Sequence, residues 1–111
     1  MVNTPSVVFK GKSGTDYTFW VYSRDTKFQE GCSGIYFVTR REQVDGGSFN
    51  HTRVYVGQTD DLSTRFDDHH KELCFNGQRA NCLCVMAVAD EARRLQIERD
   101  LIDNYNPPCN G

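Results

Sequence analysis

Five side chains capable of acid–base or metal-binding chemistry fall at positions where a plain apolar residue would be expected to pack. They are Tyr36, Tyr55, Arg65, His69 and Glu98. A phenol or an imidazole can take a proton from water, and a guanidinium can neutralise the charge that develops on phosphoryl oxygens. A single carboxylate suits Mg²⁺, which keeps most of its water ligands. Together these groups are the ones that hydrolysis of a phosphodiester bond requires.

Glu98 lies on the apolar side of a helix predicted over residues 90–105. The apolar arc of the helical wheel consists of Leu95, Leu101, Ile102 and Tyr105. Glu98 falls inside this arc, where a carboxylate is costly unless it is paired, protonated or bound to a cation. A salt bridge to Arg65 or Arg94 and a metal-ligand role both meet that requirement, and the wheel favours neither.

A helix predicted over residues 59–75 places a histidine and an arginine in a similar setting. Its apolar stripe consists of Leu62, Phe66 and Leu73. His69 lies in the middle of this stripe, and Arg65 lies on its edge. A lone histidine there is more often a hydrogen-bonded core residue than a catalytic one, so its role stays open. The charged residues outside the stripe, predicted to face solvent, are Asp67, Asp68, Lys71 and Glu72.

The two tyrosines belong to strands predicted over residues 35–40 and 53–58. The connecting loop suggests the pairs Arg40 with Arg53, Val38 with Tyr55, and Tyr36 with Gly57. In that register both tyrosines share one face of the sheet, and Gly57 leaves room above the Tyr36 ring. Because tyrosine is common in strands, the tyrosines alone do not indicate a site.

Two further strand regions complete the predicted sheet. Residues 7–23 predict a β-hairpin around the turn GKSGTD, and residues 82–89 predict a strand. The hairpin carries apolar and aromatic residues on both of its faces, and one of these faces must pack on the core. The 111 residues therefore predict one α+β domain.

The ends of both helices carry start and stop signals. Asp60 or Thr59 can cap the first helix, and Gly77 lies just past its end. The second helix begins near Asp90 and is stopped by Pro107–Pro108.

Composition and cysteine use favour a cytoplasmic protein. The sequence has no apolar run long enough to cross a membrane and no secretory signal at its start. Its five cysteines, with no C-x-x-C pair, predict reduced residues rather than a zinc or redox motif. Cys82 and Cys84 alternate along a strand and so point the same way. The net charge of −2 gives no overall basic footprint for nucleic acid, although a local one is possible.

The ordered motifs resemble those of the GIY-YIG endonuclease family. They are GIY at 34–36, YVG at 55–57, Arg65, His69, Glu98 and the ending YNPPCN. The resemblance covers residues 34–110, with valine in place of isoleucine in the second tripeptide. It implies a central three-stranded antiparallel sheet flanked by helices, to which residues 7–23 add an N-terminal hairpin.

The resemblance also implies a role for each matched residue. Glu98 would hold one divalent cation, Mg²⁺ or Mn²⁺, and Arg65 would stabilise the transition state. Tyr36 would act as general base or orient the water, and Tyr55 would place the nucleophile or the phosphate. His69 would assist proton transfer or hold a tyrosine. Asn110 would order the site or contact the phosphate.

The expected activity is cleavage of DNA, with single-stranded or non-duplex DNA favoured. Aromatic residues of the hairpin that do not pack on the core can stack on unpaired bases. The expected substrate-binding residues are Trp20, Arg40, Arg53 and Gly57. Two other functions stay open: a nucleic-acid-binding module without turnover, and a small interaction protein whose polar residues form internal salt bridges. The sequence does not indicate the oligomeric state.

Overall fold

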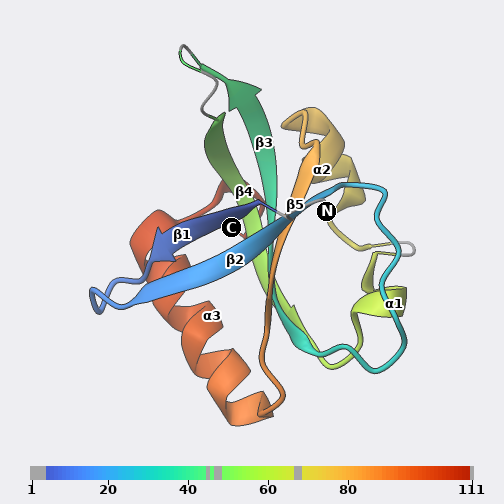
Figure 1. Ribbon diagram of the computed structural model, residues 1–111, viewed down its shortest axis with the longest axis vertical. Helices are drawn as coiled ribbons and strands as arrows, with labels where there is room; N and C mark the ends of the chain where they lie inside the picture. The colour runs from blue at the N-terminus through green and yellow to red at the C-terminus, as the bar shows by residue number, and fades with distance from the viewer. Residues whose placement is uncertain (1–4, 45, 47–48, 67–68, 111) are drawn as a thin grey trace.

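The protein folds around a five-stranded antiparallel sheet. The computed structural model describes residues 5–44, 46, 49–66 and 69–110. The strands are β1 (Ser6–Lys10), β2 (Asp16–Ser23), β3 (Gly34–Gln43), β4 (Phe49–Thr59) and β5 (Cys82–Ala87). They are ordered β1-β2-β5-β3-β4 (Figure 1). The helices are α1 (Leu62–Arg65), α2 (Glu72–Gly77) and α3 (Glu91–Tyr105), followed by the 3₁₀ turn η2 (Pro108–Asn110). The predicted α+β class is confirmed.

The prediction of a three-stranded sheet is wrong. The hairpin β1–β2 is no separate addition, because β2 pairs antiparallel with β5, with Trp20 opposite Val85. This pairing covers the backbone of β5, which would otherwise be an exposed edge. Tyr17, Phe19 and Val21 of β2 are buried, so one face of the hairpin packs on the core as expected.

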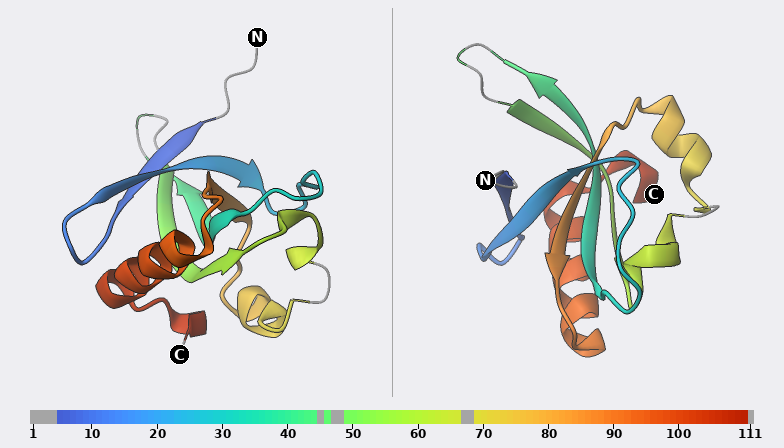
Figure 2. Two further views of the ribbon diagram at one scale, coloured as in Figure 1. Left: turned by 90° about the horizontal axis from the view of Figure 1, so that it is seen from below. Right: turned by 45° about the vertical axis from the view of Figure 1, so that its right-hand side comes forward.

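The sheet carries a hydrophobic core on each of its faces. One core joins Phe9, Phe19 and Phe37 to Ile97 and Leu101 of α3. The other core joins residues of β3, β4 and β5 to α1, α2 and η2 through Leu62, Phe75 and Cys109. Helix α3 therefore lies on one side of the sheet and the short helices lie on the other (Figure 2).

The register of β3 and β4 places both tyrosines on the same face, as predicted. Tyr36 lies opposite Gly57, and Val38 lies opposite Tyr55. The predicted pair Arg40–Arg53 is wrong, because the register shifts between Val38 and Thr39. Beyond this irregularity Arg40 lies opposite Thr52. Both strands also continue into the segment predicted to be a loop.

The single helix predicted over residues 59–75 is wrong. Two short helices replace it, and Asp61, rather than Thr59 or Asp60, caps α1 by accepting a hydrogen bond from Ser63 N–H. Leu73 is 88% exposed, so the predicted apolar stripe does not continue into α2. Gly77 is the last residue of α2 rather than the residue after it. Residues 67 and 68, predicted to face solvent, lie outside the described residues.

Helix α3 begins and ends where the sequence predicts. Asp90 caps it, and Asn106 closes it in the left-handed conformation just before Pro107. The buried stripe differs from the predicted arc, since Leu95 is 47% exposed. The stripe consists of Arg94, Ile97 and Leu101. The Arg94 guanidinium donates hydrogen bonds to three acceptors, the carbonyls of Val88 and Ala89 and the side chain of Gln58. These bonds allow an arginine to be buried where the sequence alone favours leucine.

The prediction of five reduced cysteines is also wrong. Cys74 and Cys109 form a disulfide, whereas Cys32, Cys82 and Cys84 are free. Because disulfides are rare in reducing compartments, the cysteines no longer support a cytoplasmic location. Within the described residues, no helix is long and apolar enough to cross a membrane.

Candidate active site

The structure brings four of the predicted site residues together on one face of the sheet. The Tyr36 hydroxyl lies 2.8 Å from His69 Nε2 and accepts a hydrogen bond of 2.9 Å from Arg65 Nε. The Tyr55 ring centroid is 6.0 Å from that of Tyr36. We call Tyr36, Tyr55, Arg65 and His69 the phenol cluster. Its members come from β3, β4, the end of α1 and the segment before α2.

Both glycines of the tripeptide motifs permit close approaches that a side chain would block. A Cβ atom on Gly57 would lie 2.6 Å from the Tyr36 hydroxyl oxygen. A Cβ atom on Gly34 would lie 2.4 Å from the carbonyl oxygen of Met86. Gly57 therefore makes room for the Tyr36 phenol, and Gly34 makes room for the neighbouring strand β5.

The hydrogen bonds of His69 define its tautomer. The backbone N–H of Lys71 donates to Nδ1 at 3.0 Å. A backbone N–H is a donor only, so Nδ1 must carry the lone pair when the ring is neutral. The ring proton is then on Nε2, which donates to the Tyr36 oxygen. This oxygen consequently receives two hydrogen bonds, one from His69 and one from Arg65.

Electrostatics keep both groups neutral near pH 7. Burial raises the pKa of Tyr36, and Tyr55 adds to the rise, while the hydrogen bond and charge of Arg65 oppose it. Burial lowers the pKa of His69 to about 4, and the charges of Arg65, His70 and Lys71 contribute. Tyr36 has 0% of its surface exposed and His69 has 5%. Water therefore does not reach the phenol freely in this conformation.

Glu98 approaches the site from the other side of the sheet. It lies on α3, which packs against β4, the edge strand. Burial raises the pKa of its carboxyl, while a hydrogen bond from the backbone of Gln58 and the charges of Arg99 and Arg65 lower it. Gln58 directly follows Gly57, so the carboxylate is near the end of β4 that covers the phenol. Glu98 itself is not part of the phenol cluster.

The salt bridges considered for Glu98 do not form. Among the described residues, Glu98 makes no ion pair, and Arg94 instead bonds Gln58 and two carbonyls. The carboxylate is half-buried and makes no direct ion pair with any residue that the structure describes. A divalent cation bound here would neutralise the charge of the Glu98 carboxylate.

Arg65 joins the phenol cluster to an open, polar cavity. Its Nε donates to Tyr36, and its side chain also lines the cavity. The cavity has a volume of about 300 Å³. It is lined by Gln58, Thr59, Asp60, Arg65, Glu91 and Arg94. An anionic group in this cavity would meet Arg65 directly.

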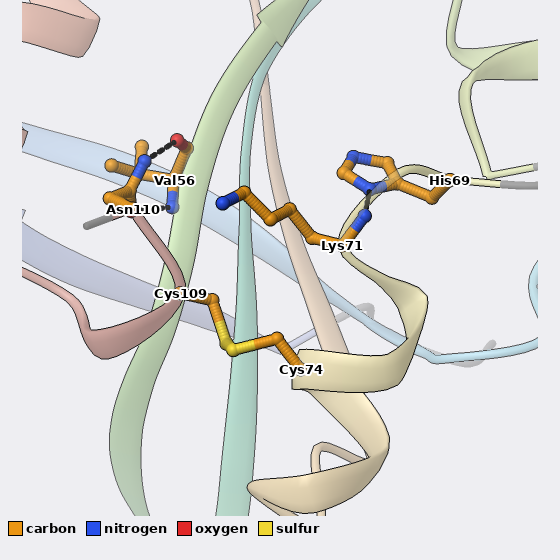
Figure 3. Close-up of a disulfide and its surroundings, with 6 residues drawn as sticks. All are labelled: Val56, His69, Lys71, Cys74, Cys109 and Asn110. Carbon is orange, nitrogen blue, oxygen red and sulfur yellow. Dashed lines mark hydrogen bonds between the residues drawn. A yellow bond between two sulfur atoms is a disulfide. The ribbon is translucent and has the colours of Figure 1, made fainter.

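Asn110 is bonded to the backbone of β4 beside the phenol cluster. Its side-chain amide accepts from the N–H of Val56 and donates to the carbonyl of Val56, each at 2.9 Å. This pair of bonds holds the outer edge of β4 between Tyr55 and Gly57. Figure 3 shows the same turn tied to α2 by the disulfide of Cys109 and Cys74.

Two residues near the site were not identified from the sequence. The ring of His70 stacks on that of His69, with centroids 4.6 Å apart. Lys71 was predicted to face solvent, but it is only partly exposed and Figure 3 shows its side chain pointing toward β4. Its backbone also fixes the His69 tautomer. No periodic pattern reveals these positions, because they lie in an irregular segment between two helices.

Three predicted substrate-binding residues lie away from the phenol cluster. The Arg53 guanidinium stacks over Tyr105, 4.2 Å from the ring centroid, on the α3 side of the sheet. Arg40 pairs with Glu42. Trp20 is 48% exposed on β2. Only Gly57 among the predicted substrate-binding residues contacts the cluster.

Comparison with protein-family models, with curated proteins and with solved structures gives no match for this chain.

Proposed function

We propose that this protein hydrolyses phosphodiester bonds in DNA with the help of one divalent cation, Mg²⁺ or Mn²⁺, in the manner of GIY-YIG endonucleases. The observation that carries the proposal is the convergence of Arg65 and His69 on the Tyr36 hydroxyl. Two donors on one phenol oxygen oppose the rise in its pKa that burial and Tyr55 cause. Once the phenol is ionised, its oxygen can accept a proton during the reaction.

Glu98 is the residue that would hold the cation. Its carboxylate is half-buried, has a raised pKa and lacks an ion pair among the described residues. Hard, oxygen-preferring cations such as Mg²⁺ bind through one or two carboxylates and keep several waters. When bound, such a cation acts as a Lewis acid and lowers the pKa of groups around it.

Tyr36 is a better candidate than His69 for the general base. His69 already uses its lone pair to accept from Lys71 N–H, and its other nitrogen carries the proton that it gives to Tyr36. The histidine is therefore a donor that stabilises a phenolate. Arg65 adds a second donor and a positive charge. These interactions oppose the cost that burial imposes on the ionised phenol.

Arg65 would also neutralise charge on the phosphate. Its side chain lines the cavity of about 300 Å³. A guanidinium binds phosphate oxygens in a bidentate manner, and the contact strengthens as charge builds in the transition state. Lys71 provides a second cation on the same side of the sheet.

Single-stranded or otherwise unpaired DNA is the favoured substrate. Trp20 lines an apolar cavity of about 490 Å³ together with Tyr22 and Phe28. Tyr22 and Phe28 pack against the core that contains Tyr36, so this cavity opens on the same face as the phenol cluster. Exposed aromatic rings beside an apolar surface suit stacking of unpaired bases. Arg40 and Arg53 do not line this cavity and are not part of the proposed DNA-binding surface.

The burial of Tyr36 favours one alternative function, a nucleic-acid-binding module without turnover. A phenol with 0% of its surface exposed accepts no proton from bulk water unless the surrounding segment opens. Such a module would still use Arg65, Lys71 and Trp20 to bind DNA.

The deciding experiment incubates the protein with labelled single-stranded, duplex and branched DNA of the same sequence. Each substrate is tested with Mg²⁺, with Mn²⁺ and with chelator. Cation-dependent products that Glu98→Gln abolishes are expected, with the single strand cut fastest. Binding without products, unchanged in Glu98→Gln, would establish the alternative. Preference for intact duplex would remove the proposed role of Trp20.

A further inference from the structure

Three metal-binding side chains meet on the α3 side of the sheet, away from the phenol cluster. They are His51 of β4 and Cys82 and Cys84 of β5. Their ligand atoms all lie within 4.8 Å of one another. We call these residues the thiol–imidazole trio. Among the described residues, it is the only group of at least three His, Cys, Asp or Glu side chains with this proximity.

The topology of the sheet explains why the trio forms. Cys82 and Cys84 are two positions apart on one strand, so their side chains point to the same face. They belong to the core under α3 with Phe9 and Phe37. Strand β3 separates β4 from β5, and His51 reaches across it next to Thr39, whose hydroxyl is 3.0 Å from Nδ1.

The spacing of the trio agrees with a tetrahedral zinc site. With Zn–S near 2.3 Å and Zn–N near 2.0 Å, tetrahedral ligand atoms lie roughly 3.5–3.8 Å apart. The Cys84 sulfur is 3.9 Å from His51 Nδ1. Adjustment by less than about 1 Å would bring all three ligand atoms onto one ion.

We propose that His51, Cys82 and Cys84 bind a zinc-class ion, which prefers sulfur and imidazole ligands. The fourth position falls to water or to the Thr39 hydroxyl. Binding releases the remaining thiol protons to solvent, and two thiolates with one neutral imidazole cancel the charge of a divalent ion. A dication is thus held in a nearly buried site with no net charge, which avoids the cost of burying unpaired charge.

The thiol–imidazole trio differs from Glu98 in its route to solvent and in the type of its ligand atoms. The two cysteines are buried, while His51 is partly exposed and gives the ion a route from solvent. Thiolates and imidazole select zinc-like ions, whereas a lone carboxylate suits Mg²⁺ or Mn²⁺. The ion would tie β4 to β5 across β3, and this role does not depend on the proposed nuclease activity.

The test uses the full chain with its disulfide intact, prepared without reductant and under argon. Co²⁺ is the probe, because thiolate coordination gives it an intense charge-transfer absorption. We expect saturation at one equivalent of Co²⁺ and displacement by one equivalent of Zn²⁺. Cys84→Ser and His51→Ala should each weaken binding more than about a hundredfold, beyond the usual effect of an outer-shell partner. Zn²⁺ at a hundredfold excess over its Kd should raise Tm by roughly 10 °C.

Two matched controls make the outcome decisive. Cys32→Ser removes the exposed free thiol, and Glu98→Gln removes the hard-cation ligand; both should retain the Co²⁺ charge-transfer band of the parent chain. If Cys84→Ser does not fold, His51→Ala at its partly exposed position still tests the site. Absence of binding, binding without the charge-transfer band, or binding that His51→Ala leaves unchanged would each overturn the proposal.

Discussion

The Nε2 atom of His69 lies 2.8 Å from the Tyr36 hydroxyl, and its proton points toward that oxygen. This direction follows because Lys71 N–H occupies the other ring nitrogen at 3.0 Å. The imidazole is therefore a donor to the phenol and positions it. The proposed division of roles makes Tyr36 the proton acceptor and His69 its support.

Substitution of the two residues should have different kinetic signatures. Tyr36→Phe should lower the cleavage rate by about 10²–10⁴, the range for loss of a general base. His69→Ala should lower it less and move the ascending limb of the pH–rate profile to higher pH, because the phenolate loses one donor and the pKa of the base rises. Near-normal turnover of Tyr36→Phe would contradict this assignment.

The depressed pKa of His69 makes stability depend on pH in mildly acidic solution. The folded-state pKa is about 4, against an ordinary value of 6.5, so between these values the unfolded chain binds more protons. The free energy of unfolding should therefore fall as pH drops from 6.5 toward 4, by at most about 1.4 kcal/mol per pH unit from this group. Urea titrations of the parent chain and His69→Gln measure the effect. Equal pH slopes for the two proteins would show that the histidine is not responsible.

Removal of the Glu98 charge should separate function from folding. The raised pKa means that the ionised carboxylate is less stable in the fold than in the unfolded chain. Glu98→Gln should thus leave Tm unchanged or slightly higher, while cleavage falls by about a hundredfold or more. Asp103→Asn, which removes an exposed partner of Arg99 on the same helix, is the control and should retain activity. A marked loss of stability in Glu98→Gln would instead favour a structural salt bridge and the interaction-protein alternative.

The two glycines at positions 57 and 77 should respond oppositely to alanine. Gly57→Ala places a Cβ atom 2.6 Å from the Tyr36 oxygen, so overpacking should cost about 1–3 kcal/mol and displace the phenol. A Cβ atom on Gly77, at the end of α2, meets nothing within 4 Å. Gly77→Ala should be neutral or stabilising by up to about 1 kcal/mol. Chemical denaturation and the cleavage assay on both variants check this; a tolerated Gly57→Ala would refute the close approach.

The disulfide should stabilise both the fold and the site. It joins residues 35 positions apart, and closing a loop of that size is worth about 3–4 kcal/mol in the chain-entropy estimate. The double variant Cys74→Ser with Cys109→Ser should lose roughly this much stability. Cleavage should also fall, because η2 carries the Asn110 clamp on Val56 and α2 follows His69. Cys32→Ser is the matched control, and equal stability of the two variants would contradict the prediction.

The sequence predicted the structure correctly where that structure depends on neighbouring residues in the chain. Asp90 and the prolines after Asn106 fix the ends of α3, since caps and prolines act on the residues beside them. The predicted pairs Tyr36 with Gly57 and Val38 with Tyr55 are correct, and they place both tyrosines on one face of the sheet. The prediction then failed at Arg40, because a register shift between Val38 and Thr39 has no signal in composition.

The helical wheels were less reliable, because a wheel takes no account of tertiary contacts. Leu95 and Leu73 are exposed, whereas Arg94 is buried with three hydrogen-bond acceptors. A wheel ranks residues by hydrophobicity and does not include the two carbonyls and the amide that accept hydrogen bonds from this guanidinium. Glu98 nevertheless proved to be half-buried and without an ion pair among the described residues.

What the sequence determined by itself is the set of reactive groups and the short-range structure around them: the strands that carry Tyr36 and Tyr55, the helix that carries Glu98, and the α+β class. Tertiary structure alone decided which distant residues meet. Pairing of β2 with β5, the bond between Cys74 and Cys109, and the meeting of His51 with Cys82 and Cys84 all join segments separated by tens of residues. Local sequence fixes backbone preference and side-chain direction, but contacts between distant segments depend on how the whole sheet and its two cores assemble.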